Sequence, residues 1–270
     1  MHIGTDDHQL HVSRWDGNGP PALLIHGIGS SGTGWNDLSP LLADFLEPYA
    51  IDLRGHGQSA HPDSGYLYDD YIDDLDRLLP ALEISNPILI GHSLGGIVAL
   101  WWAARHSHQA AAVVAIDSPL RSGEEFRPAF DAWIAQNAMP VDDLAAHYLQ
   151  NNPDWTADRA RRRAEILTRT APGVFWELKD DSMHHHGVDR IAELEQIEAP
   201  VLLIRGDPRC GSLVHPADAD ALVTRLPNAE VMVIPDGTHS LHRQFPQEVV
   251  GAIRSFLARH RVITGEAHLL

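Results

Sequence analysis

The sequence of 270 residues predicts an α/β fold in which helices flank a mostly parallel central sheet. Short β-rich runs alternate with helical patterns along most of the chain, as expected for a sheet covered by helices on both faces. Some runs are apolar throughout, such as 113–116 and 201–204, which is typical of strands buried on both sides. Between residues 120 and 197 the pattern is helical only, and this predicts an inserted helical cap.

The expected elements follow in chain order. The predicted strands are 9–15, 22–26, 48–52, 87–91, 112–117, 200–206 and 229–235. The helices predicted around them are 35–45, 68–82, 94–105, 217–226 and 246–259. Residues 1–119 and 198–270 should therefore form the α/β core.

The cap is expected over residues 120–197, above the functional site. Its predicted helices are 124–137, 141–151, 156–170 and 174–183. Thr156 precedes the third of them as a capping residue, and the arginines at 159 and 161–163 are expected to face water.

Composition excludes several classes of partner. The chain has 20 Lys and Arg against 37 Asp and Glu, a formal net charge of −17. This charge argues against nucleic acid and against anionic membranes. The single cysteine, Cys210, cannot form an internal disulfide and suits a reducing compartment. No leader peptide and no membrane-spanning stretch is visible, so we expect a cytoplasmic protein.

The segment Gly91–His92–Ser93–Leu94–Gly95 matches G-x-S-x-G, the nucleophile elbow. An apolar run precedes it and a buried helical pattern follows, as the strand–turn–helix geometry of this motif requires. The serine of such a turn has a strained backbone, and side chains at the two glycines would collide with it. Ser93 is therefore the predicted nucleophile.

A serine needs a neighbouring base, and His239 is the best-placed histidine. It follows the last predicted strand in Asp236–Gly237–Thr238–His239, which would bring it to the carboxyl edge of the sheet. His242 is the competitor, but the following residues suggest that it begins a surface connection. The oxyanion should be held by the N–H groups of Leu94, after the nucleophile, and of Ile28, in the glycine-rich loop 27–32. This loop lacks the Lys-Ser/Thr of a phosphate-binding loop.

Four segments in order resemble the α/β-hydrolase fold superfamily, in particular its esterase-like serine hydrolases with a helical cap. They are His26–Gly27–Ile28–Gly29, the turn from Asp52 to Ser59, the elbow, and Gly237–Thr238–His239. The resemblance covers essentially the whole chain. In the second segment, Asp52 and Arg54 are expected to order loops beneath the site.

The resemblance implies an acid for the triad, and two aspartates qualify. The position that usually holds this acid in the family is occupied by Arg209, which cannot orient an imidazolium. The remaining candidates are Asp207, two residues earlier, and Asp117, at the end of the strand after the elbow. Asp207 is favoured because Pro208 and a glycine make its loop a dedicated turn. Asp117 stays the alternative.

The predicted activity is that of a carboxylesterase acting on a small, mostly apolar ester, with no metal or organic cofactor. The histidine run at 184–186 is interpreted as a polar cap segment and not as a metal site. Lactones and C–C bonds are alternative substrates for the same triad, and a hydrolase-like binding protein with little turnover is the non-enzymatic alternative. Aromatic candidates for the pocket wall are Phe126, Phe130, Trp133, Phe175 and Trp176.

Overall fold

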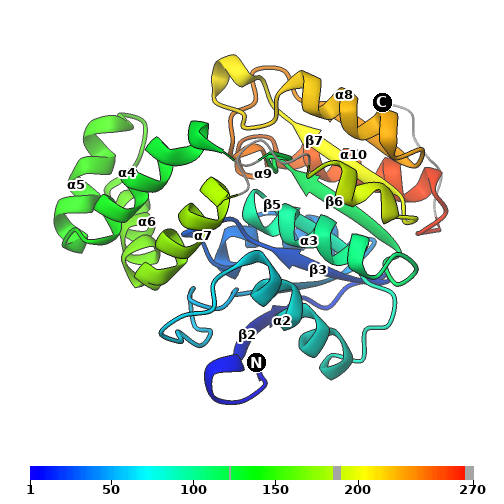
Figure 1. Ribbon diagram of the computed structural model, residues 1–270, viewed down its shortest axis with the longest axis horizontal. Helices are drawn as coiled ribbons and strands as arrows, with labels where there is room; N and C mark the ends of the chain where they lie inside the picture. The colour runs from blue at the N-terminus through cyan, green and yellow to red at the C-terminus, as the bar shows by residue number, and fades with distance from the viewer. Residues whose placement is uncertain (122, 185–189, 265–270) are drawn as a thin grey trace.

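The computed structural model describes residues 1–121, 123–184 and 190–264 (Figure 1). Within these residues eight strands form one sheet in the order β1-β2-β4-β3-β5-β6-β7-β8. The strands are β1 His2–Ile3, β2 Leu10–Arg14, β3 Pro21–Ile25, β4 Glu47–Ile51, β5 Ile88–His92, β6 Ala112–Ile116, β7 Val201–Arg205 and β8 Ala229–Val233. The seven predicted strands are present, and β1 is an addition of two residues, too short for a periodic signal.

The sheet is parallel from β4 to β8, whereas β2 runs antiparallel to β4 and β1 antiparallel to β2. Register places Leu24, Ile90 and Val114 side by side on neighbouring strands. All three belong to the apolar cluster on one face, while Leu23 and Leu89, one position earlier, belong to the cluster on the other. Because alternate side chains enter opposite cores, the central strands must be apolar at every position.

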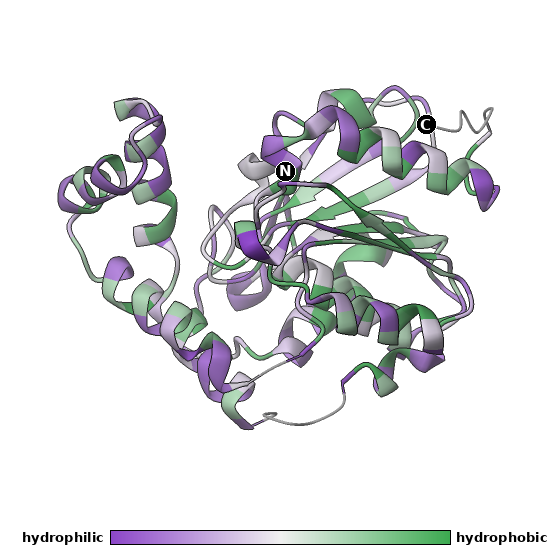
Figure 2. Ribbon diagram, turned by 90° about the horizontal axis from the view of Figure 1, so that it is seen from above, coloured by the Kyte–Doolittle hydropathy of each residue, from purple (hydrophilic) through white to green (hydrophobic). Residues whose placement is uncertain are grey.

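Helices cover both faces of this sheet (Figure 1). The core helices are α1 Ser39–Leu42, α2 Tyr68–Ala81, α3 Leu94–Arg105, α8 Pro216–Arg225, α9 Leu241–Gln244 and α10 Pro246–Arg259. The faces are divided between them, because α2, α3 and α8 contribute to one apolar cluster and α1, α9 and α10 to the other. Figure 2 shows the resulting concentration of hydrophobic residues in the strands between the layers.

The helix predicted at 35–45 is wrong as a continuous element. The structure has a 3-10 helix, η2 Gly32–Trp35, followed by the single turn α1. Pro40 lies at the start of α1, where its ring and missing N–H prevent the preceding residues from continuing one helix through it. The other 3-10 helices are η1 Asp6–His8, η3 Glu124–Phe126, η4 Ala192–Gln196 and η5 Pro208–Cys210.

A helical insertion joins β6 to β7 and projects beyond the sheet (Figures 1 and 2). It consists of α4 Arg127–Asn137, α5 Val141–Asn151, α6 Ala157–Arg169 and α7 Pro172–His184. Part of it packs around its own apolar cluster of Leu144, Tyr148, Ala160, Ala164, Leu167 and Phe175. The insertion therefore has a small core of its own in addition to its contacts with the sheet domain.

Helix α6 begins directly after the capping residue that its sequence predicts, and its arginines face water with one exception. The Thr156 hydroxyl accepts a hydrogen bond from the Arg159 N–H at 3.2 Å and so caps the helix. Arg161 faces outward and pairs with Asp142 at 2.7 Å. Arg163 does not face water freely, because it is half-buried and donates to the carbonyl oxygen of Gly29. The periodicity of a charged helix could not reveal which arginine turns toward the core.

Among the described residues, the helices lack the combination of length and hydrophobicity that a membrane crossing requires.

Candidate active site

Ser93 lies at the sharp turn between β5 and α3. Its backbone has φ 53° and ψ −119°, a conformation that non-glycine residues rarely adopt, and its N–H donates to the carbonyl of Ile116 at 3.0 Å. A Cβ at Gly91 would lie 2.2 Å from the carbonyl oxygen of Gly95, and one at Gly95 would lie 2.1 Å from that of Ile25. Both glycines are thus sterically required, and the strained turn is held by its surroundings.

His239 pairs with Asp117 and not with Asp207. The Nδ1 atom of His239 lies 2.8 Å from Oδ2 of Asp117, whose side chain is fully buried. This carboxylate also accepts hydrogen bonds from the Ser212 hydroxyl and from the Leu213 N–H, the latter at 2.9 Å. Three donors around a buried carboxylate fix its orientation, and this orientation in turn fixes the imidazole.

The favoured expectation for the acid, Asp207, disagrees with this geometry. Its carboxylate accepts from the backbone N–H of Arg209 at 2.8 Å and from Nη2 of the same arginine at 2.5 Å. These hydrogen bonds lower the pKa of Asp207 to about 2. The arginine in the family's usual acid position therefore folds back on Asp207 and engages it, whereas Asp117 is left to His239.

His92 connects the histidine loop to the elbow. Its Nε2 donates to the carbonyl oxygen of His239 at 2.8 Å, and the two rings lie 4.6 Å apart. His239 thus lies beside the residue that precedes Ser93. In the part of the chain that the structure describes, Nε2 of His239 has no hydrogen-bond partner, so the nitrogen that a general base requires is available.

His242 is buried, and the expectation that it begins a surface connection is wrong. Its side chain packs 4.4 Å from the ring of His92 and 5.0 Å from that of Trp35. Burial lowers the pKa of His242 well below its usual value, and so the ring is neutral. The short helix α9 starts directly after the loop that contains His239. It directs the side chains of Leu241 and His242 into the core.

The two predicted oxyanion donors border the same small pocket as Ser93. The pocket has a volume of about 50 Å³ and includes Ile28, Ser93 and Leu94 in its lining. Among the hydrogen bonds of the described residues, neither the Ile28 nor the Leu94 N–H acts as a donor. Leu94 is the first residue of α3, where an unpaired N–H and the helix dipole favour a negative charge.

Two histidines that the sequence did not single out as site residues hold the Ile28 loop in place. Nδ1 of His26 donates to the carbonyl of Gly27 at 2.8 Å, and Nε2 accepts from the Leu53 N–H at 3.0 Å. His56 accepts from the Gly29 N–H at 3.1 Å through its own Nε2. Burial lowers the pKa of His26 to about 4 and that of His56 to about 3. Both must be neutral, because a protonated ring could not accept these bonds. Their only sequence signal is the His-Gly pair that each begins.

Asp52 and Arg54 tie loops together, as predicted. The Asp52 carboxylate accepts from the Gly32 N–H at 2.6 Å and from the Gln58 N–H at 2.9 Å, and so joins the loops after β3 and β4. Arg54 forms a buried pair with Asp74 on α2, with Nε and Nη2 at 2.6 and 2.5 Å from its two oxygens. Both groups are satisfied by structural partners.

The pocket wall is mostly apolar, and the insertion supplies part of it. Phe126, Phe130 and Trp133 line the pocket, as expected. Phe175 is instead fully buried in the insertion's own cluster, and Trp176 is half exposed. One cationic residue, Arg121, also lines the pocket, and its guanidinium bonds the carboxylate of Asp218. The lining favours a small, mainly apolar ligand.

One cluster of possible metal ligands occurs among the described residues. Atoms of Asp207, Cys210 and Asp236 come within 4.8 Å of one another at the surface. Arg209 already neutralises Asp207, so this cluster does not resemble a prepared metal site. Of the histidine run at 184–186, the last two residues lie outside the described part of the chain.

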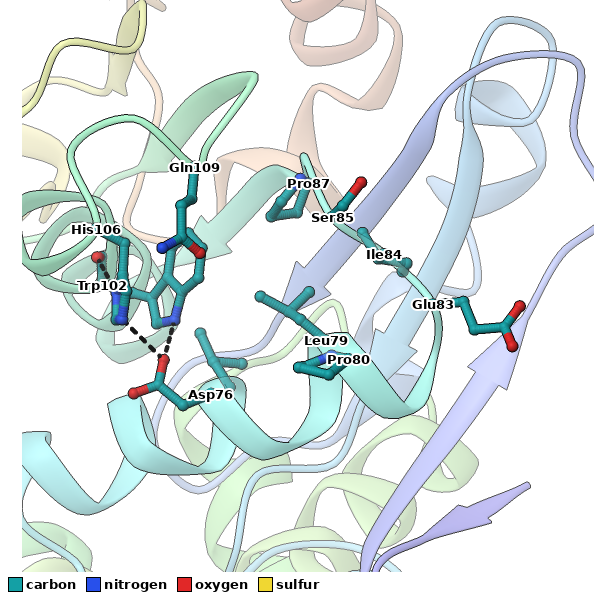
Figure 3. A pocket seen from close by; sticks show the side chains of 11 residues that line it. Asp76, Leu79, Pro80, Glu83, Ile84, Ser85, Pro87, Trp102, His106 and Gln109 are labelled. Atoms are coloured by element: carbon teal, nitrogen blue, oxygen red, sulfur yellow. Dashed lines mark hydrogen bonds and ion pairs between the residues drawn. The ribbon is translucent and has the colours of Figure 1, made fainter.

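A larger cavity, of about 490 Å³, lies at the amino end of β5, opposite the elbow (Figure 3). It is lined by residues of α2 and α3 and of the turn that precedes β5. Asp76 accepts a hydrogen bond from Nε1 of Trp102 at 2.7 Å and lies 3.2 Å from Nε2 of His106. Ser85 lines the cavity as well, on the side away from this pair.

Comparison with known proteins gives a consistent result over nearly the whole chain. The profile of the alpha/beta hydrolase family matches residues 22–252. The chain is 31% identical over 253 residues to 2-(acetamidomethylene)succinate hydrolase of Mesorhizobium japonicum, which covers 90% of each protein. It is 28% identical over 258 residues to the sn-1-specific diacylglycerol lipase ABHD11 of Mus musculus, covering 88% of this chain and 81% of the lipase. The crystal structure of E-2-(acetamidomethylene)succinate hydrolase superposes with a TM-score of 0.78 at 28% identity, covering 95% of this chain and 98% of that one.

Proposed function

The chain belongs to the alpha/beta hydrolase family and is a hydrolase by that membership, and we propose that it works as a serine hydrolase through Ser93, His239 and Asp117. The observation that carries this proposal is the 2.8 Å contact between His239 and a fully buried Asp117, beside a strained serine at the end of β5. Loops after β5, β6 and β8 supply the three residues in the order Ser, Asp, His.

The proposed reaction begins with attack of Ser93 Oγ on the substrate carbonyl carbon. Nε2 of His239 takes the hydroxyl proton and passes it to the departing alkoxide oxygen, as the ester C–O bond breaks. Asp117 keeps the imidazole in the Nδ1–H tautomer and stabilises the imidazolium. Water, deprotonated by His239, then attacks the acyl carbon. The bond between Ser93 Oγ and the acyl group breaks, His239 returns the proton to Oγ, and the carboxylic acid leaves.

Ile28 and Leu94 are the proposed oxyanion donors. Their N–H groups have no acceptor among the described residues and border the pocket that contains Ser93. Negative charge develops on the carbonyl oxygen only as the tetrahedral intermediate forms, so the donors favour the transition state over the substrate. His26 and His56 would keep the Ile28 donor in place.

The substrate that fits best is a small, mostly apolar carboxylic ester. The pocket is small and its wall is largely Phe, Trp, Leu and Ile, and residues 120–197 would cover it as a cap. A second candidate follows from the 31% identity to 2-(acetamidomethylene)succinate hydrolase, which makes that compound a substrate to test directly. Lactones and C–C bonds would require the same triad.

A panel of p-nitrophenyl esters of increasing acyl length tests the proposal, with 2-(acetamidomethylene)succinate and a simple lactone beside it. We expect turnover of the short esters, which falls as the acyl chain outgrows the pocket. The Ser93→Ala variant should abolish this turnover. If no compound is turned over and no serine-directed phosphonate reacts with Ser93, the chain is a binding protein with a hydrolase fold.

A further inference from the structure

A second site of a different character lies between α6 and the loop that follows β3. It is a cavity of about 510 Å³, and four arginines contribute to its wall: Arg159, Arg162, Arg163 and Arg243. Asp37 is the one acidic residue among the described residues that line it. The formal charge of the lining is therefore strongly positive.

This concentration of positive charge is unusual for the chain that carries it. The whole protein has 20 Lys and Arg against 37 Asp and Glu, so a fifth of its cationic side chains converge here. In the described part of the chain, none of the four arginines forms an ion pair. Arg161, on the same helix, differs, because it pairs with both Asp142 and Glu165. The cavity is cationic because its own arginines lack carboxylate partners.

Three of the four arginines are positioned by other contacts. The guanidinium of Arg159 stacks 4.3 Å from the ring of Trp155, and Arg163 donates to the carbonyl oxygen of Gly29. Arg243 reaches from α9 and donates to Ser30 Oγ at 3.2 Å. These contacts involve aromatic, carbonyl and hydroxyl groups, which orient a guanidinium but leave its charge uncompensated.

The arginines are close enough to affect one another. Burial and the positive charges of Arg163 and Arg159 together lower the pKa of Arg243 to about 10, against a smaller opposing effect of Asp37. All the guanidinium groups remain protonated at neutral pH. An anion in the cavity would remove this mutual repulsion.

The loop between Gly27 and Gly34 separates this cavity from the pocket at Ser93. Ile28 lines the Ser93 pocket, whereas Thr33 and Gly34 line the cationic cavity. The two sites are thus neighbours that share one loop, but their linings differ completely.

We propose that the cationic cavity is a binding site for the phosphate group of a small phosphate monoester. A phosphate presents two negative charges and several acceptor oxygens around a single atom, which suits a cavity whose wall contains several guanidinium groups. A dicarboxylate carries the same charge at two separated points and suits a convergent cluster less well. The site does not depend on hydrolysis at Ser93.

Calorimetric titration of the full chain with inorganic phosphate, at about pH 8 and low ionic strength, tests this site, because phosphate is then mainly a dianion. Succinate, sulfate and acetate serve as the comparison anions. Phosphate should bind saturably with one site, more tightly than succinate and much more tightly than acetate. The double variant Arg159→Gln/Arg162→Gln changes two exposed side chains, and we expect it to weaken phosphate binding about tenfold or more.

Two further variants make the result specific. Arg161→Gln removes a positive charge from the same helix but outside the cavity, and it should bind phosphate as the unmodified chain does. Ser93→Ala should also bind phosphate normally, which separates this site from the proposed hydrolysis. Absence of saturable phosphate binding, tighter binding of succinate, or an equal loss in Arg161→Gln would overturn the proposal.

Discussion

Two of the aspartate–histidine pairs among the described residues lie at opposite ends of the sheet. Asp117 and His239 meet at the carboxyl end, 2.8 Å apart, and Asp76 and His106 meet at the amino end, 3.2 Å apart. The amino-end pair even borders a cavity of about 490 Å³, far larger than the pocket at Ser93, and a serine, Ser85, also lines this cavity (Figure 3). The presence of a serine, a histidine and an aspartate near a cavity therefore does not distinguish the two ends.

The surroundings of the two pairs explain why only one is suited to catalysis. Both ring nitrogens of His106 are engaged, because Nε2 faces Asp76 and Nδ1 donates to the carbonyl of Trp102 at 2.9 Å. His239 has its Nδ1 on Asp117, while its Nε2 has no partner among the described residues. A general base needs such a free nitrogen. The hydrogen bonds of each histidine, and not merely the presence of serine, histidine and aspartate, therefore distinguish the two ends.

Substitution of the serine at each end, Ser93 or Ser85, should give the largest difference in kcat between the two ends. Ser93→Ala is expected to lower kcat on a short ester roughly 10⁵- to 10⁶-fold, because it removes the atom that forms the acyl-enzyme. Ser85→Ala should leave kcat unchanged, since Ser85 lies on the side of its cavity away from Asp76 and His106. Steady-state kinetics on the two variants makes the comparison, and an active Ser93→Ala enzyme would contradict the assignment.

Substitutions of the two candidate acids, Asp117 and Asp207, should differ nearly as much in their effect on kcat. Asp117→Asn should lower kcat by about 10⁴-fold, because the amide favours the wrong imidazole tautomer without disturbing the packing. Asp207→Asn is the matched control in the loop after β7, and its kcat should be almost unaffected. The opposite ranking of these two variants would return the role of the acid to Asp207.

His26, at the carboxyl end of the sheet, should make the free energy of unfolding depend on pH. The folded-state pKa of His26 is about 4, below the unfolded value of 6.5, so the unfolded chain binds more protons as the pH falls from 6.5 to 4. Its contribution to stability is fully present above pH 6.5 and is lost across that range, about 2 kcal/mol by pH 5. Urea unfolding at pH 7 and pH 5 measures this loss, and the loss should be smaller in His26→Gln, whose amide can still accept from the Leu53 N–H.

The amino-end pair should affect stability alone, and modestly. Asp76→Ala leaves the buried indole N–H of Trp102 without its acceptor, which should cost about 1–3 kcal/mol in the free energy of unfolding. Turnover of the folded enzyme should not change. A selective loss of kcat in Asp76→Ala, with normal urea unfolding, would mean that this end of the sheet takes part in the reaction.

Much of the fold was predictable because its signals are local. Short β-rich runs predict the seven longer strands, and the register of β5 and β6 explains why these two strands lack polar–apolar alternation. The elbow was also predictable, since its glycines are required by contacts within one short turn. The apolar pattern over residues 35–45 predicts one helix, whereas Pro40 makes the structure break between η2 and α1.

The partner of His239 could not be predicted, because it depends on contacts distant in sequence. Asp117 and His239 are 122 residues apart, and both aspartates follow strands that end at the same edge. Arg209 engages Asp207 from only two residues away, but the contacts that fix Asp117 beside His239 span 95 to 122 residues. The same reasoning applies to Arg163, whose contact with Gly29 spans 134 residues and was invisible to helical periodicity.

The most direct test of the proposed triad is the rate at which a fluorophosphonate labels the protein, followed by mass spectrometry of the intact chain and of its peptides. We predict one adduct, located on Ser93, which forms far more slowly in Asp117→Asn and at the normal rate in Asp76→Asn. A label on another residue, or a rate on Ser93 that Asp117→Asn does not change, would contradict the account.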